Sequence, residues 1–90
     1  MDPKSFIEAA HAQVRDFVND TRDKAQHPKE LRFEVVTVWQ CYILGNMKAL
    51  ITTDLPDGKY YEATYNAEKN ELYLDVYVRV HNHASVCAIA

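Results

Sequence analysis

Between residues 3 and 24, apolar side chains recur at spacings of three and four, the period of an amphipathic helix. Charged side chains occupy the opposite side of this stretch. Pro28 biases His27 away from helical geometry, so we expect the helix to end before this pair. The apolar stripe consists of Phe6, Ile7, Ala10, Val14, Phe17, Val18 and Thr21.

Two signals compete for the start of this helix. Asp2 can act as the N-cap of a helix with Pro3 at its first position. Alternatively, Ser5 can cap with Glu8 three residues later, the spacing of a capping box. Either start gives a helix that ends near residue 24.

From residue 31 onward the hydrophobic period changes to two, and β-branched and aromatic residues become frequent. We expect tight turns at Gly45-Asn46 and at 55–58, and a polar turn at 66–70. Successive hairpins predict an antiparallel meander. The fold class is therefore α+β, a single domain over 1–90 with one long N-terminal helix packed on a four-stranded antiparallel meander sheet. The strands are expected at 31–44, 47–53, 59–65 and 71–81, followed by a small apolar tail at 84–90 that we assign to no element.

The fourth expected strand separates its two faces clearly. Its aliphatic set is expected to face the helix, which carries the apolar stripe available to cover it. The other face then carries tyrosines and charges. The two sets are Leu72, Leu74, Val76, Val78 and Val80 on one side, and Tyr73, Asp75, Tyr77, Arg79 and His81 on the other.

The first expected strand is apolar on both faces, a pattern typical of a strand that is covered on both sides. One helix covers only one face, so the tail, a second copy of the chain or a partner is expected to cover the other. We predict that Trp39 faces the core and that Cys41 is buried. The expected companions of Trp39 in the core are Val14, Phe17, Phe33, Leu74 and Val76.

Composition narrows the function classes. The 90 residues include 10 Lys and Arg against 13 Asp and Glu, for a net charge of −3. This balance disfavours non-specific binding to nucleic-acid backbones. We expect neither a signal peptide nor a membrane-spanning stretch. The two cysteines, Cys41 and Cys87, lack metal-type spacing and are expected to be free thiols. We therefore expect a cytoplasmic protein, with nucleic acid an unfavoured partner.

A candidate protein-binding face lies on the side of the sheet away from the helix. Tyrosine offers a large contact area at low entropic cost, which is typical of interaction hot spots. Two other interpretations stay open: tyrosines that simply favour strands, or a base-stacking platform. The residues assigned to the face are Tyr42, Tyr60, Glu62, Tyr73, Asp75, Tyr77 and Arg79.

Catalytic and metal chemistry find little support. His81-Asn82-His83 offers two imidazoles, whereas a zinc site needs three or four ligands. Glu62 and Asp75 are expected to be neighbours, but on an open sheet face without a pocket. We expect no catalytic residues, no cofactor and no metal, and hence no enzyme activity.

Four blocks in residues 33–80 resemble a family of small proteins encoded in bacteriophages and prophages of Gram-positive bacteria, catalogued as a domain of unknown function. They are Val-Trp-Gln-Cys ending at Cys41, Asn46-Met-Lys-Ala-Leu, Asp57-Gly-Lys-Tyr-Tyr-Glu-Ala-Thr-Tyr-Asn66 and Glu71-Leu-Tyr-Leu-Asp-Val-Tyr77. The resemblance implies no catalytic residue. It does imply a phage context, in which small acidic proteins often bind a host protein.

The leading hypothesis is a phage-derived, non-enzymatic protein-binding module that inhibits a host defence protein by occlusion, in the manner of an anti-CRISPR protein. A homodimeric structural or accessory phage protein, with a second copy as its partner, is the first alternative. A single-stranded nucleic-acid-binding module is the second.

Overall fold

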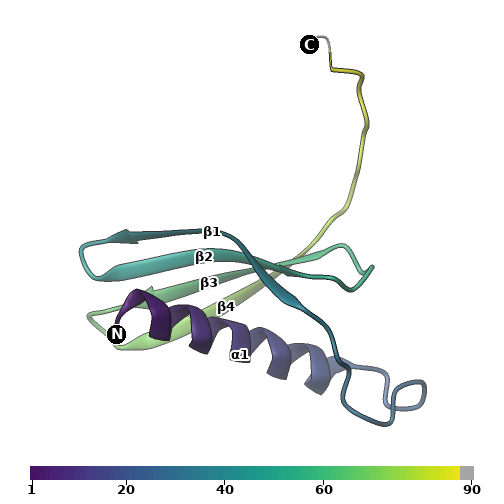
Figure 1. The fold of residues 1–90 in the computed structure, drawn as a ribbon, viewed down its shortest axis with the longest axis horizontal. Coiled ribbons are helices and arrows are strands. Elements are labelled where there is room, and N and C mark those ends of the chain that lie inside the picture. The colour runs from purple at the N-terminus through teal and green to yellow at the C-terminus, as the bar shows by residue number, and fades with distance from the viewer. Residues whose placement is uncertain (88–90) are drawn as a thin grey trace.

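The computed structural model describes residues 1–87. Helix α1 (Pro3–Thr21) is followed by β1 (Val35–Ile43), β2 (Asn46–Thr53), β3 (Lys59–Asn66) and β4 (Glu71–Val78). The strands form one antiparallel sheet in the order β1-β2-β3-β4, and α1 lies across one face of it (Figure 1). The predicted α+β class, with the helix at the N-terminus, is confirmed.

Helix α1 begins at the first of the two predicted start signals. Asp2 is the N-cap, Pro3 follows it, and the backbone N–H of Ser5 donates to the Asp2 carboxylate at 2.8 Å. This hydrogen bond lowers the pKa of Asp2, because it favours the ionised carboxylate.

The helix ends at Thr21, three residues before the predicted end. Arg22 is already extended (φ −64°, ψ 152°). Its guanidinium donates to the carbonyl of Asn19 at 2.5 Å and to that of His27 at 3.0 Å. The first of these bonds satisfies a carbonyl group that another helical turn would have used, and the second holds the loop after the helix.

The hydrophobic core lies between α1 and the sheet. Four helix residues are buried: Phe6, Ala10, Val14 and Val18. Beneath them, β2 contributes Met47, Ala49 and Ile51, and β3 contributes Tyr61, Ala63 and Tyr65. The predicted core residues Phe17, Phe33, Leu74 and Val76 are partly buried and pack against this cluster.

The hairpin between β1 and β2 turns at Leu44-Gly45 instead of the predicted Gly45-Asn46. Both turn residues have positive φ, 51° and 82°, as a two-residue type I′ turn requires. Asn46 instead opens β2, where it pairs with Ile43.

The outer strands are shorter than predicted. Strand β1 begins at Val35, four residues after the predicted start. Strand β4 ends at Val78, which pairs with Lys59, the first residue of β3. The N–H of Arg79 donates one further hydrogen bond to the carbonyl of Gly58 at 2.9 Å. The pairing ends there, because β3 begins at Lys59. Residues 79–87 are exposed and lead away from the sheet (Figure 1), so they cover neither of its faces. Of the predicted tail, 88–90 lie outside the described residues.

A β-bulge in β1 overturns the prediction for Trp39. Thr37 pairs with Ile51 but Trp39 pairs with Leu50, so Val38 is an extra residue. The insertion shifts the alternation of side chains by one position. Trp39 therefore lies on the face away from α1 and is 43% exposed, and Cys41, predicted to be buried, is exposed beside it.

Candidate functional site

The sheet face opposite α1, here called the open face, is covered by no other described element. Its members follow from the register, since directly paired residues point to the same side. They are Val36, Trp39, Cys41 and Ile43 of β1; Asn46, Lys48, Leu50 and Thr52 of β2; Tyr60, Glu62, Thr64 and Asn66 of β3; and Glu71, Tyr73, Asp75 and Tyr77 of β4.

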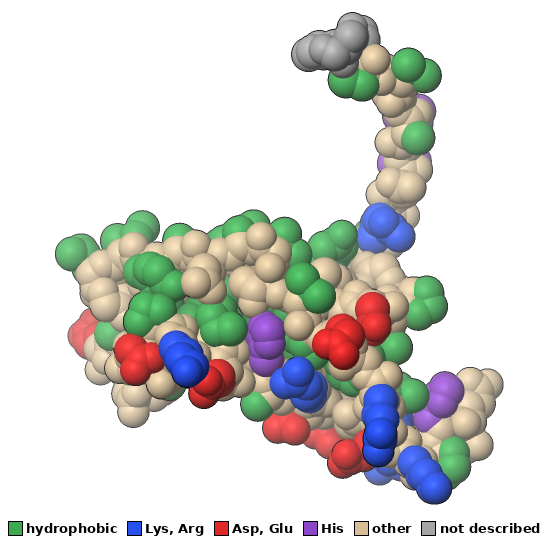
Figure 2. All heavy atoms as spheres, viewed as in Figure 1, with side chains coloured by type: hydrophobic (Ala, Val, Ile, Leu, Met, Phe, Trp, Pro, Cys, Tyr) green, Lys and Arg blue, Asp and Glu red, His purple; other side chains and the backbone are tan. Residues whose placement is uncertain are grey.

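The half of the open face nearest β1 is apolar. Trp39 lies directly opposite Leu50, and Ile43 at the hairpin end is 67% exposed. Figure 2 shows hydrophobic side chains gathered along the edge of the molecule where β1 lies, while charged groups concentrate over α1 and the loop after it. An exposed apolar strip of this kind is typical of an interaction surface.

A charged pair lies at the centre of the open face. Lys48 Nζ lies 3.0 Å from Glu62 Oε1 across the β2–β3 pair. The hydrogen bond and charge of Glu62 raise the pKa of Lys48. Asp75 is the cross-strand neighbour of Glu62, and among the described residues it has no salt-bridge partner. The carboxylate of Asp75 is thus available to a cationic group from outside.

Three tyrosines line the other half. Tyr60 and Tyr77 are directly opposite each other, and Tyr77 is 52% exposed. The Tyr73 hydroxyl donates to the Glu71 carboxylate, and this hydrogen bond raises the pKa of Tyr73. This half of the face therefore presents three partly exposed tyrosine side chains.

The structure brings together five of the seven predicted face residues: Tyr60, Glu62, Tyr73, Asp75 and Tyr77. Arg79 follows β4, where its guanidinium lies near Gly58 and lines a shallow surface pocket with Tyr60.

The prediction for Tyr42 is wrong. Tyr42 pairs with Met47 and lies on the helix side of the sheet, because the bulge shifted the alternation. For the same reason sequence reasoning missed Trp39, Cys41 and Ile43. The sequence signal for these residues was that both faces of β1 are apolar. This pattern does not show where a bulge lies, so it could not assign the residues to a face.

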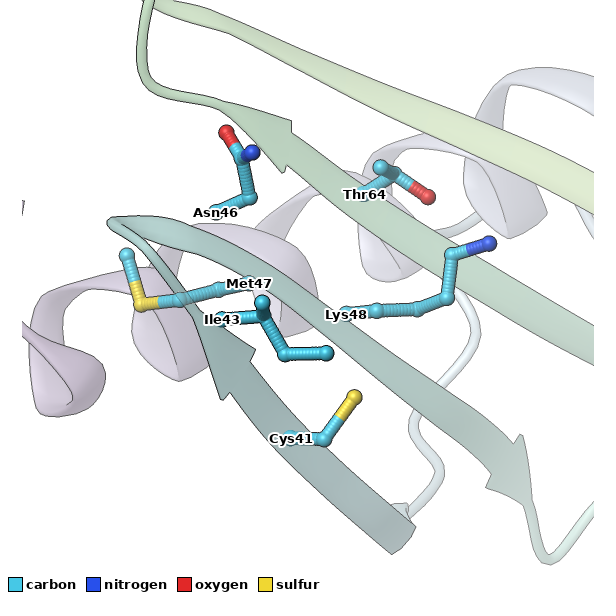
Figure 3. A pocket seen from close by; sticks show the side chains of 6 residues that line it. All are labelled: Cys41, Ile43, Asn46, Met47, Lys48 and Thr64. Carbon is cyan, nitrogen blue, oxygen red and sulfur yellow. The ribbon is translucent and has the colours of Figure 1, made fainter.

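A shallow hollow of about 200 Å³ lies at the hairpin end of the open face (Figure 3). Cys41 and Ile43 border it from β1, and the Lys48 side chain extends toward Thr64 along its far side. Its other lining residues are Asn46 and Met47. Its volume is sufficient for one apolar side chain of a partner, and its apolar lining suits such a side chain.

Within residues 1–87, no group of three or more His, Cys, Asp or Glu side chains is arranged to hold a metal ion. Over the same residues, no helix combines the length and the apolar character that crossing a bilayer requires.

Comparison with known protein families matches residues 7–87 to a family described as "Family of unknown function (DUF6275)". The match begins within α1 and runs through β4 into the extended segment that follows it. Comparisons with curated proteins and with solved structures found no match.

Proposed function

The chain belongs to the DUF6275 family, whose function is unknown, and we propose from the geometry of its open face that it is a protein-binding module. The observation that carries this proposal is the exposure of Trp39, Tyr73 and Tyr77 on one uncovered sheet face. Trp and Tyr are enriched among the few residues that supply most of the binding energy at protein interfaces.

The chemistry of the face indicates the character of the partner. The apolar half around Trp39 fits an apolar patch, and the hollow beside Ile43 fits one inserted side chain. Asp75 lies among the tyrosines and offers an acceptor to a lysine or arginine. With a net charge of −3, the chain would be steered toward a basic surface. The partner we propose is therefore a protein with an apolar patch bordered by basic residues.

Host defence nucleases meet the basic part of this description, because proteins that bind nucleic acid do so with lysine and arginine. The four sequence blocks that resemble phage-encoded proteins support the same partner. We place the chain among phage-derived inhibitors that cover such a surface and block access to it without chemistry, as an anti-CRISPR protein does.

The test is a plaque assay in a bacterium whose CRISPR–Cas nuclease targets an incoming phage, combined with a binding measurement on the purified nuclease. Wild-type chain is expected to restore plaques and to bind. Tyr77→Glu is expected to weaken binding at least tenfold, because it places a charge within the aromatic half of the face. Folding should survive, since exposed substitutions usually change stability by less than about 0.5 kcal/mol.

Val80→Glu is the matched control. Val80 is an exposed apolar residue on the extended segment, off the sheet, so this variant should bind as the wild type does. Absence of protection by the wild type would contradict defence inhibition. Equal binding by wild type and Tyr77→Glu to every partner recovered from host lysate would contradict the role of the open face altogether.

A further inference from the structure

The two edges of the sheet differ in charge. Strand β4 carries Glu71 and Asp75, and charges of this kind keep an edge from pairing with other strands. Strand β1 is the opposite edge, and none of its nine residues is charged or is proline. Its outward N–H and C=O groups therefore form an unprotected template for another strand.

The bulge limits how much of this edge can pair regularly. Before Val38, the even-numbered residues of β1 lie on the open face. After it, the odd-numbered residues do. From Trp39 to Ile43 the alternation is unbroken: Trp39, Cys41 and Ile43 lie on the open face, and Gln40 and Tyr42 on the helix side. Regular pairing with an incoming strand is thus confined to these five residues.

We propose that this stretch pairs with the same stretch of a second copy, antiparallel, with Cys41 on the twofold axis. An isologous pair must place equivalent residues at equal distances from its axis. With the axis at Cys41, Trp39 of each copy lies opposite Ile43 of the other, and Gln40 lies opposite Tyr42. Every pair then joins residues of the same face.

The residues flanking this stretch point to the same occupant. Leu44 is 95% exposed and has a φ of 51°, a conformation in which glycine or asparagine is usual. Its own chain leaves this apolar side chain in solvent. In the proposed pair, Leu44 lies beside Val38 of the second copy, another exposed aliphatic residue.

A second copy also suits the chemistry of the edge. Since β1 carries no charge, no like charges meet across the axis. On the helix side, Gln40 Nε2 donates to Tyr42 Oη at 2.6 Å within one chain, and both side chains are exposed, so α1 does not obstruct the approach. The dimer would join two sheets into one and place two open faces side by side. It extends the proposed function but does not depend on it.

The first test is the molar mass in solution. The molar mass of the wild type is expected to rise with protein concentration toward twice the 10.4 kDa of one chain. Within one chain, Cys41→Glu places a carboxylate opposite Lys48 of β2, where it is tolerated. In the dimer, the same carboxylate would lie opposite its counterpart in the second copy, and the two like charges would repel. This variant should need at least a tenfold higher concentration to dimerise.

Tyr77→Glu is the matched control, because it puts the same charge on the open face far from the β1 edge. It should dimerise like the wild type while losing the protein partner, which separates the failure of this inference from the failure of the proposed function. A wild type that stays monomeric at every concentration, or a dimer that survives Cys41→Glu, would overturn the inference.

The second test is disulfide trapping in a Cys87→Ser background. Directly opposed residues have Cα atoms about 4.5–5.5 Å apart, within disulfide range. Mild oxidation should therefore link Cys41 to its copy. The control, Ile43→Cys with Cys41→Ser, also places its thiol at an exposed position, but the thiols of the two copies would be about 13 Å apart along the strand. Equal linkage in both proteins would show random collision and contradict the proposed register.

Discussion

The exposure of Trp39 sets how much its side chain contributes to stability. Replacing a buried tryptophan by alanine lowers the free energy of unfolding by about 3–5 kcal/mol. Trp39, however, is 43% exposed and lies outside the core. We expect Trp39→Ala to lower the free energy of unfolding by about 1 kcal/mol. Ile51→Ala, at a fully buried position, should lower it by about 2–5 kcal/mol. Urea unfolding of the two variants at low protein concentration measures both values. A greater loss for Trp39→Ala than for Ile51→Ala would contradict the placement of Trp39.

Between elements, the contact of α1 with β1 includes a titratable group. His11 Nε2 lies 2.7 Å from Thr37 Oγ1. Burial, with a smaller contribution from Arg15, lowers the pKa of His11 from its ordinary 6.5. As the pH falls through 6.5, His11 is therefore protonated more readily in the unfolded chain than in the folded chain. The free energy of unfolding falls as the pH drops below this value.

We expect His11→Gln to remove this part of the pH dependence. Melting temperatures measured between pH 7.5 and 5.5 should fall further for the wild type than for the variant. His81→Gln, a substitution on the exposed segment after β4, should retain the wild-type response. Parallel curves for wild type and His11→Gln would contradict a role of this contact in acid sensitivity.

For the molecule as a whole, charge argues against nucleic acid as a ligand. The net charge is −3, and the open face carries Glu62, Glu71 and Asp75 against one lysine, Lys48. We expect no micromolar binding to single-stranded RNA or DNA at low salt in a gel-shift assay. Reversing two carboxylates, in Glu71→Lys with Asp75→Lys, should introduce weak, salt-sensitive binding. Salt-sensitive micromolar binding by the wild type itself would contradict this prediction.

The sequence by itself determined the features that depend on near neighbours. The periods of three to four and of two separated the helix from the sheet, and Asp2-Pro3 was one of two visible helix starts. The alternation along β4 assigned Leu72, Leu74 and Val76 to the helix side, and Tyr73, Asp75 and Tyr77 to the open face. Three of the seven candidate face residues followed from it, and Tyr60 and Glu62 followed from the predicted pairing of β3 with β4. These features are local, because side-chain direction in a regular strand depends only on position along it.

Tertiary structure alone decided the phase of β1 and the ends of the outer strands. In the sequence, Val38 has the pattern of an ordinary strand residue. The pairing of Trp39 with Leu50 makes Val38 a bulge residue, which puts Trp39 on the open face and Tyr42 on the helix side, the reverse of the prediction. Strand β4 stops at Val78 because β3 has no residue before Lys59 to pair with it. Both results depend on hydrogen bonds to another strand. A pattern of apolar residues along one strand does not contain the pairing that selects among its registers.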